Sequence, residues 1–254
     1  SGVEEELIKY KYYFQFNSVE RENFELGRIN LNFSDLAGVI LVGAYNEGFV
    51  LKLRELGLPM VLVDEYIPSE DIISVMIDNT DGILKACKYL CELKHKRVAY
   101  ISEEKNEATA YEHYYGFKQA QEMFGFVNDD KLITESSGKI NDGFRAMERI
   151  LEQNKVLPTA VLAYNDIIAI GAMDAIKQHG LSIPKDISVI GFDDVRLARE
   201  VVPALTTVHV PKHLMGIISV QRLINVIQGK KDIIKKVLVP TELKVRKSTA
   251  LAKT

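Results

Sequence analysis

Polar side chains directly follow several short apolar runs, which places groups able to bind a ligand at regular points along the chain. Asp64 follows one such run, Asn165 a second and Asp193 a third. A carboxylate accepts two hydroxyl protons at once, and charge-assisted hydrogen bonds of this kind are strong. These residue types therefore suit a neutral polyhydroxy ligand. For Asp166 we favour a different role, as a helix cap, because it directly precedes an apolar helical stretch.

Other chemistries find little support in the sequence. The Asp193-Asp194 pair could serve a glycosidase only if its carboxylates faced each other across a bond, and sequence neighbours on one turn do not. The chain has no phosphate-binding loop, no dinucleotide fingerprint and no nucleophile elbow. Its 5 histidines show no metal-ligand spacing. Cys87 and Cys91 are four apart, which fits buried helix positions better than a disulfide. We expect no catalytic residues, no metal and no cofactor.

Composition limits the protein classes that remain. The chain has 254 residues, is 47% hydrophobic and 26% charged, and carries a formal net charge of −3. That small negative charge argues against this chain binding nucleic acid by itself, because phosphate contacts need clustered Lys and Arg. No apolar run approaches the roughly 20 residues that cross a bilayer, and no signal-peptide pattern opens the chain. Two reduced cysteines fit the cytoplasm.

The apolar runs themselves predict the elements that must position the polar residues. They lack polar alternation, which is typical of parallel strands covered by helices on both faces. Between them, helical spacing of apolar residues and stop signals at Gly and Pro predict helices. Strands joined by helices wind into an open α/β sheet, which binds ligands at the carboxyl ends of its strands. The predicted strands are 39–42, 60–63, 98–101, 160–163 and 187–190, and the predicted helices are about 48–56, 81–93, 108–124 and 166–179.

Four stretches follow in a characteristic order from Pro158 onward. They are PTAVLAYNDIIAIGA at 158–172, GLSIPKDISVIGFDD at 180–194, PALTTV at 203–208 and VRKST at 245–249. Each is weak alone, but their order and spacing are specific together. With these stretches the chain resembles the LacI/GalR family of transcription regulators, and the resemblance spans essentially its whole length.

The resemblance implies the periplasmic-binding-protein type I fold, with two doubly wound parallel-sheet lobes joined by three crossover strands. Carried onto this sequence, the first lobe takes 1–77 plus 209–238, and the second takes 78–208 plus 239–254. A ligand held in the cleft between such lobes closes a hinge and biases a two-state protein.

The resemblance also implies roles for three of the polar residues. Asp193 looks like the carboxylate that takes two hydroxyls of the effector. Asn165 would add an amide contact, and Asp64 would approach the ligand from the opposite lobe.

Three ring-bearing residues complete the implied site. His113 stands where many family members have an arginine that grips the ligand. Histidine is shorter than arginine and donates fewer hydrogen bonds, so the hydrogen bonds to the ligand must differ from those that the arginine makes. Tyr45 and Phe192 could stack on a sugar face, although simple packing explains Phe192 equally well.

Family members begin with a helix-turn-helix head, a hinge and a first β-strand. The opening residues, from Ser1 to Leu7, resemble the back half of the helix that follows that strand. We therefore expect operator DNA to be bound through a helix-turn-helix that is not present in this chain. We also expect the first strand of the first lobe to be absent from it.

The final third, with HLMG at 213–216 and VLVPTELKVR at 237–246, looks most like the β-galactosidase-operon branch of the family. This favours galactose or a galactoside as effector. The function that follows is the effector-sensing domain of a cytoplasmic, homodimeric repressor. The alternative is an exported sugar-binding protein that feeds a transporter and shares the fold, whereas an enzyme has no motif in its favour.

Overall fold

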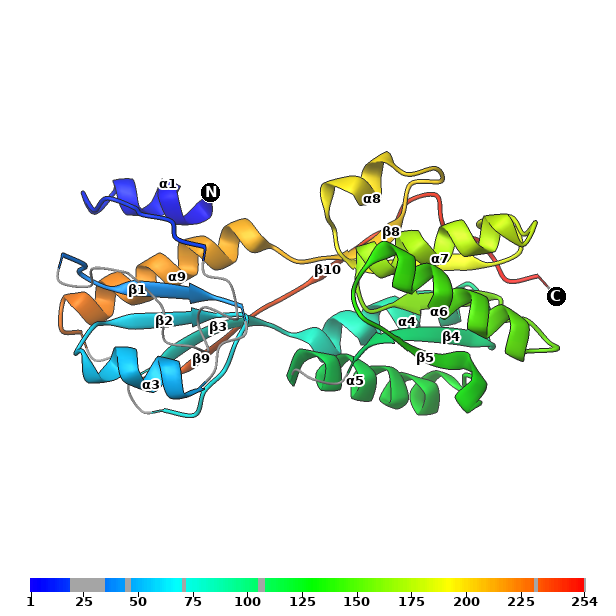
Figure 1. Cartoon of the computed structure of the whole chain (residues 1–254), viewed down its shortest axis with the longest axis horizontal. Helices are drawn as coiled ribbons and strands as arrows, with labels where there is room; N and C mark the ends of the chain where they lie inside the picture. Colours follow the sequence, from blue (N-terminus) through cyan, green and yellow to red (C-terminus); the bar gives the residue numbers. More distant parts are fainter. Residues whose placement is uncertain (19–34, 44–46, 70–71, 105–107, 231–232, 254) are drawn as a thin grey trace. The chain divides into compact units, whose positions relative to one another are not determined.

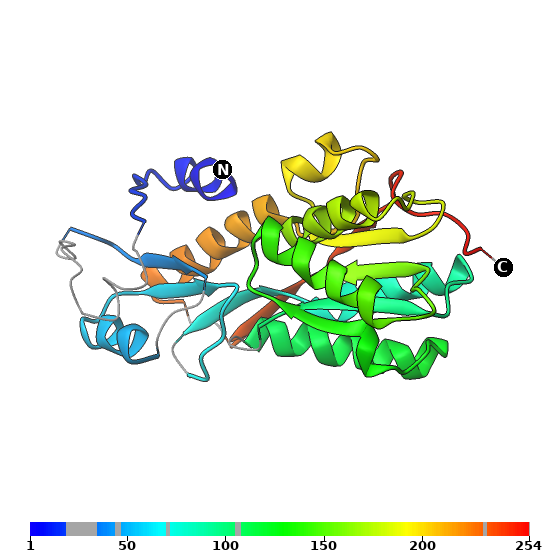
Figure 2. The ribbon, with the colours of Figure 1, turned by 45° about the vertical axis from the view of Figure 1, so that its right-hand side comes forward.

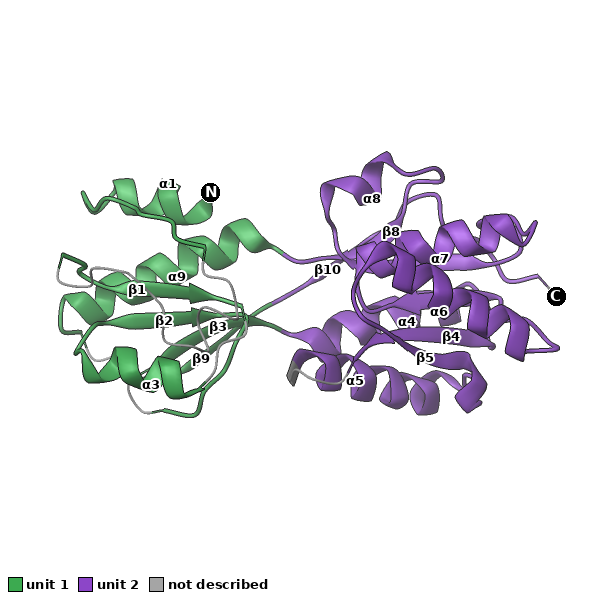
Figure 3. Ribbon diagram, viewed as in Figure 1, with its two compact units in different colours: residues 1–77, 211–239 green, residues 78–210, 240–254 purple. Residues whose placement is uncertain are grey.

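The chain divides into two compact α/β units in the computed structural model, which describes residues 1–18, 35–43, 47–69, 72–104, 108–230 and 233–253. Unit 1 comprises residues 1–77 and 211–239, and unit 2 comprises residues 78–210 and 240–254 (Figure 3). The chain therefore passes from one unit to the other three times.

Unit 1 is built on a parallel sheet whose described strands run in the order β1-β2-β3-β9. Successive side chains of a strand point to opposite faces of the sheet. Ile40 packs with the helices α1 and α9, whereas Leu41 packs with α3. The strands are β1 (Val39–Val42), β2 (Met60–Val63), β3 (Ile73–Ile77) and β9 (Lys236–Val239), and the helices are α1 (Gly2–Ile8), α3 (Glu47–Glu55) and α9 (Lys212–Ile227).

Unit 2 is built on a larger sheet, in the order β10-β8-β7-β6-β4-β5, in which only β10 runs antiparallel to its neighbour. Helices α4 and α5 cover one face, and α6 and α7 cover the other (Figures 1 and 2). The strands are β4 (Val98–Glu103), β5 (Ile133–Ser136), β6 (Ala160–Ala163), β7 (Ser188–Asp193), β8 (Thr206–His209) and β10 (Glu242–Lys244). The helices are α4 (Asn79–Glu92), α5 (Ala108–Phe124), η1 (Asp130–Leu132), α6 (Ile140–Gln153), α7 (Asp166–Gln178) and α8 (Arg196–Glu200).

The core of unit 2 explains why its central strands are apolar without interruption. Ala99 and Ile101 pack into the cluster formed with α6 and α7. Tyr100, between them, faces the other side and stacks on Phe117 of α5, with ring centroids 4.7 Å apart. Because both faces are covered, every position of such a strand must be apolar. The predicted α/β class with helix-covered parallel sheets is confirmed.

Candidate functional site

The strand order of unit 2 defines one place where neighbouring loops diverge. From β4 the chain crosses through α5 to β5 on one side, whereas β6, β7 and β8 continue on the other side. Open sheets of this order bind ligands at the carboxyl ends of the strands at this switch point. Here it lies between β4 and β6, where α5 begins after β4 and Tyr164 follows β6.

Three rings meet at this switch point. His113 of α5 is buried, with 3% of its surface exposed. Its ring centroid lies 4.6 Å from that of Tyr164 and 4.5 Å from that of Phe192, both tilted relative to the imidazole. Phe192 is the residue before Asp193 on β7. The structure therefore places His113, Phe192 and the start of the Asp193 loop together, as parts of one cluster.

Hydrogen bonds hold the His113 ring in place. His113 Nε2 lies 2.9 Å from Asn79 Oδ1, and Asn79 Nδ2 lies 2.8 Å from Glu112 Oε2. Burial lowers the pKa of His113 to about 3, so the ring is neutral at physiological pH. Its Nδ1 is buried and has no hydrogen-bond partner among the residues that the structure describes. Neither Asn79 nor Glu112 carries a sequence motif that indicates this role.

Phe192 fits its place because Gly82 of α4 lacks a side chain. A Cβ atom on Gly82 would lie 2.8 Å from Phe192 Cε2, inside van der Waals contact. We expect Gly82→Ala to push the Phe192 ring against His113 and to lower the melting temperature of unit 2 by several degrees, since overpacking a core costs about 1–3 kcal/mol. Thermal unfolding followed by circular dichroism measures this. Gly116→Ala is the matched control, because Gly116 also lies in a helix and its added Cβ atom would meet Ile83 only at 3.4 Å.

The end of β7 has an unusual backbone. Asp193 and Asp194 have φ angles of +103° and +51°, a region that residues other than glycine seldom occupy. Successive strained residues persist only where the surrounding structure holds them, and such positions concentrate at binding sites. Asp193 lies opposite His209 of β8 in the sheet register. Strand β7 ends at Asp193, where this pair of residues begins.

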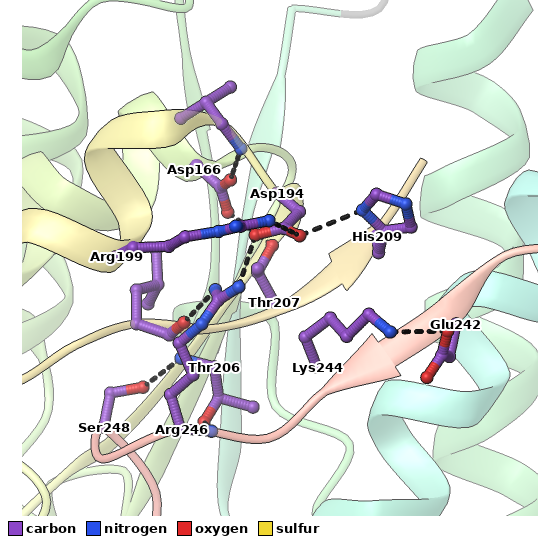
Figure 4. A network of polar contacts seen from close by, with 12 residues as sticks. Asp166, Asp194, Arg199, Thr206, Thr207, His209, Glu242, Lys244, Arg246 and Ser248 are labelled. Atoms are coloured by element: carbon purple, nitrogen blue, oxygen red, sulfur yellow. Dashed lines mark hydrogen bonds and ion pairs between the residues drawn. The ribbon is translucent and has the colours of Figure 1, made fainter. Parts of the chain in front are cut away.

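Asp194 has a structural role. Its carboxylate is 0% exposed and accepts from Arg246 at 2.5 Å and from Arg199 at 2.9 Å, with His209 Nδ1 also 2.9 Å away (Figure 4). Burial alone would raise the pKa of Asp194, but the hydrogen bonds and charges of the two arginines more than offset it and lower the pKa. Asp194 thus ties β7 to β8 and to the C-terminal segment.

The prediction that Asp166 caps α7 is wrong. Asn165 is the N-cap, and its Oδ1 accepts from the backbone N–H of Ile168 at 2.9 Å. Asp166 is buried and accepts from the Thr207 hydroxyl at 2.5 Å and the Val195 N–H at 2.8 Å. Asparagine leads the ranking of N-caps alongside aspartate, so the neighbouring residue takes the role. The Asn165 amide nitrogen remains the group it could offer to a ligand.

The two remaining predicted ligand residues belong to unit 1. Asp64 follows β2, is exposed, and has a φ of +63°. It therefore also occupies the left-handed region at the carboxyl end of a strand. Tyr45 lies outside the described residues.

The described part of the chain lacks two other kinds of feature. It holds no group of three or more His, Cys, Asp or Glu side chains placed to bind a metal ion. No helix in that part is long and apolar enough to cross a membrane.

Known proteins resemble this chain in sequence. Residues 87–249 match the family model described as periplasmic binding protein-like domain. The HTH-type transcriptional repressor PurR of Histophilus somni (strain 129Pt) is 38% identical over 192 residues, which cover 75% of this chain and 57% of the repressor. The chain thus spans little more than half the length of this relative.

Solved structures resemble the fold. The transcriptional regulator CelR in complex with cellobiose superimposes with a TM-score of 0.85 at 26% identity, covering 97% of this chain and 76% of CelR. A regulatory protein of the LacI family from Chloroflexus aggregans gives a TM-score of 0.87 at 26% identity, covering 98% of this chain and 90% of that protein.

Proposed function

The chain belongs to the family of periplasmic binding protein-like domains, in the form found in LacI-family regulators, and we propose that it is the domain through which a transcriptional repressor senses a small sugar. The observation that carries this proposal is the cluster at the switch point of unit 2. There the rings of His113, Tyr164 and Phe192 pack together. Phe192 directly precedes Asp193, whose φ angle is +103°. A carboxylate that accepts hydroxyl protons beside an apolar group of rings suits a neutral sugar.

Within this proposal each predicted residue has a task. Asp193 accepts hydroxyl protons, the Asn165 amide nitrogen donates, and His113 contributes a ring nitrogen. Asp64 and Tyr45, both from unit 1, supply further contacts. Phe192 supports the His113 ring, because it is itself 2% exposed.

Galactose and galactosides remain the first effectors to test. The relatives carry other names, PurR and CelR, and lend no support to galactose in particular. We expect a thermal-shift screen to find one stabilising compound among galactose, methyl β-galactoside, cellobiose, ribose and hypoxanthine. A ligand that binds only the folded state stabilises it by about 2.7 kcal/mol at 100 times its Kd. Stabilisation by hypoxanthine alone would contradict the sugar assignment.

The relatives disfavour the alternative of an exported sugar-binding protein, because they are regulators of transcription. The same relatives favour binding over catalysis. For the whole protein we propose operator binding through an N-terminal helix-turn-helix outside this chain, action in the cytoplasm as a homodimer, and a ligand-dependent change in affinity for DNA.

Asp193→Ala tests the assignment of the binding carboxylate. We expect the variant to bind the effector found in the screen about 10- to 100-fold more weakly, because hydrogen bonds to a charged group contribute about 1.5–3 kcal/mol each. Isothermal calorimetry measures the affinity, and circular dichroism verifies the fold. Asp174→Ala, an exposed aspartate on α7, is the matched control and should bind normally. An unchanged affinity in Asp193→Ala would remove Asp193 from the site.

A further inference from the structure

The contacts around His113 determine which of its ring nitrogens carries the proton. Glu112 Oε2 belongs to a carboxylate, which only accepts hydrogen bonds, so the atom of Asn79 that faces it at 2.8 Å must be the donating Nδ2. The amide oxygen of Asn79 then faces His113 and can only accept. His113 Nε2, at 2.9 Å from that oxygen, must therefore be the protonated nitrogen.

The second ring nitrogen follows from the first. A neutral imidazole has one N–H donor and one bare nitrogen that accepts. With the proton on Nε2, the Nδ1 of His113 is an acceptor. This acceptor is buried and unpartnered among the described side chains and backbone groups. His113 Nδ1 is one of five such side-chain atoms in the described residues. Its place beside the switch point, where open sheets bind ligands, points to a bound group that supplies the missing donor.

We propose that Glu112 and Asn79 are positioning residues that fix His113 in its Nε2–H form, so that Nδ1 selects an effector by accepting a hydrogen bond from a neutral O–H or N–H. The inference rests on the proposed function and deepens it. Glu112 sets the orientation of Asn79, and Asn79 sets the tautomer of His113, although neither needs to touch the effector. A bare acceptor repels a second acceptor, so this position disfavours a phosphate or carboxylate group.

The first test measures the tautomer and needs no effector. Nitrogen-15 NMR distinguishes the two neutral forms of histidine by chemical shift and two-bond coupling, and the His113→Gln variant assigns the signal. We expect His113 to be in the Nε2–H form in the unaltered protein. In Glu112→Gln the amide can donate as well as accept, so Asn79 can turn over and the Nδ1–H form should appear. An Nδ1–H form in the unaltered protein would overturn the inference.

A matched variant separates positioning from a general effect of charge. Glu122 lies on the same helix α5 and is exposed. We expect Glu122→Gln to leave the His113 signal and the affinity for D-galactose unchanged, whereas Glu112→Gln lowers that affinity about three- to tenfold. Equal behaviour of the two variants in both measurements would refute the positioning role.

The second test measures selection with paired probes, D-galactose against D-galactose 6-phosphate and D-ribose against D-ribose 5-phosphate. We expect the neutral member of a pair to bind at least tenfold more tightly by calorimetry, and His113→Gln, which can donate, to reduce that ratio at least threefold. A ratio of one, or a ratio that His113→Gln leaves unchanged, overturns the selection. If no probe binds, the proposed sugar function fails, while the NMR result still decides the tautomer.

Discussion

Replacing Arg246 with alanine is expected to destabilise unit 2 by about 2–3 kcal/mol, because it removes the more deeply buried of the two arginines that balance the fully buried Asp194 carboxylate. The Arg246 guanidinium donates to Asp194 Oδ1 at 2.5 Å and to the Leu205 carbonyl at 2.8 Å. Its side chain is only 16% exposed, and the Asp194 carboxylate is fully buried. The variant thus loses a charge partner and the donor to a backbone carbonyl at once.

Arg199→Ala is the matched control, because Arg199 donates to the other oxygen of the same carboxylate at 2.9 Å. Its side chain is 62% exposed, so water screens the pair, and we expect a much smaller loss of stability than in Arg246→Ala. Urea unfolding followed by circular dichroism at pH 7 measures both variants. Similar losses in the two would mean that burial does not decide the strength of these ion pairs.

Continuous apolar runs made β1, β2, β4, β6 and β7 predictable, because only a strand with both faces covered needs them. The equally buried β3, whose apolar run is interrupted by Ser74, was missed. The strand β8 was missed because its buried residues include polar ones. Thr206 and Thr207 are buried in β8 only because distant partners satisfy their hydroxyls, Thr249 for one and Asp166 for the other. Hydrophobicity along the chain carries no information about such partners. Helix α6, by contrast, has Ala146, Met147 and Ile150 at helical spacing and could have been found.

In the candidate site, too, local sequence patterns indicated some residues but not their distant partners. His113 and Asp193 were predicted from their positions in a recognisable pattern. The residues that set their chemistry were not, since Asn79 lies 34 positions from His113. Arg246 lies 52 positions from Asp194, and within the VRKST stretch nothing distinguished its ion pair from a surface charge. Local rules place the elements, whereas polar pairs far apart in sequence depend on the packed fold.

Two buried groups should give the protein opposite responses to pH, which single variants can separate. Burial raises the pKa of Asp166 to about 7, against the smaller opposing effect of the Thr207 and Val195 hydrogen bonds. Since the folded pKa is raised, the contribution of Asp166 to stability is complete below the unfolded value of 3.8 and is lost as pH rises to 7. His113 behaves oppositely, because burial lowers its pKa from 6.5 to about 3. Its contribution is complete above pH 6.5 and is lost as pH falls toward 3.

Between about pH 4 and 6.5 the two contributions oppose each other with slopes of up to about 1.4 kcal/mol per pH unit each. We therefore expect Asp166→Asn to gain stability over the unaltered protein as pH rises through this window. His113→Gln should gain it as pH falls. Differences between variant and parent, taken from urea unfolding at several pH values, remove the contributions of other groups such as His95. Two difference curves with the same sign of slope would contradict the assignment, because one buried acid and one buried base cannot shift the proton balance in the same direction.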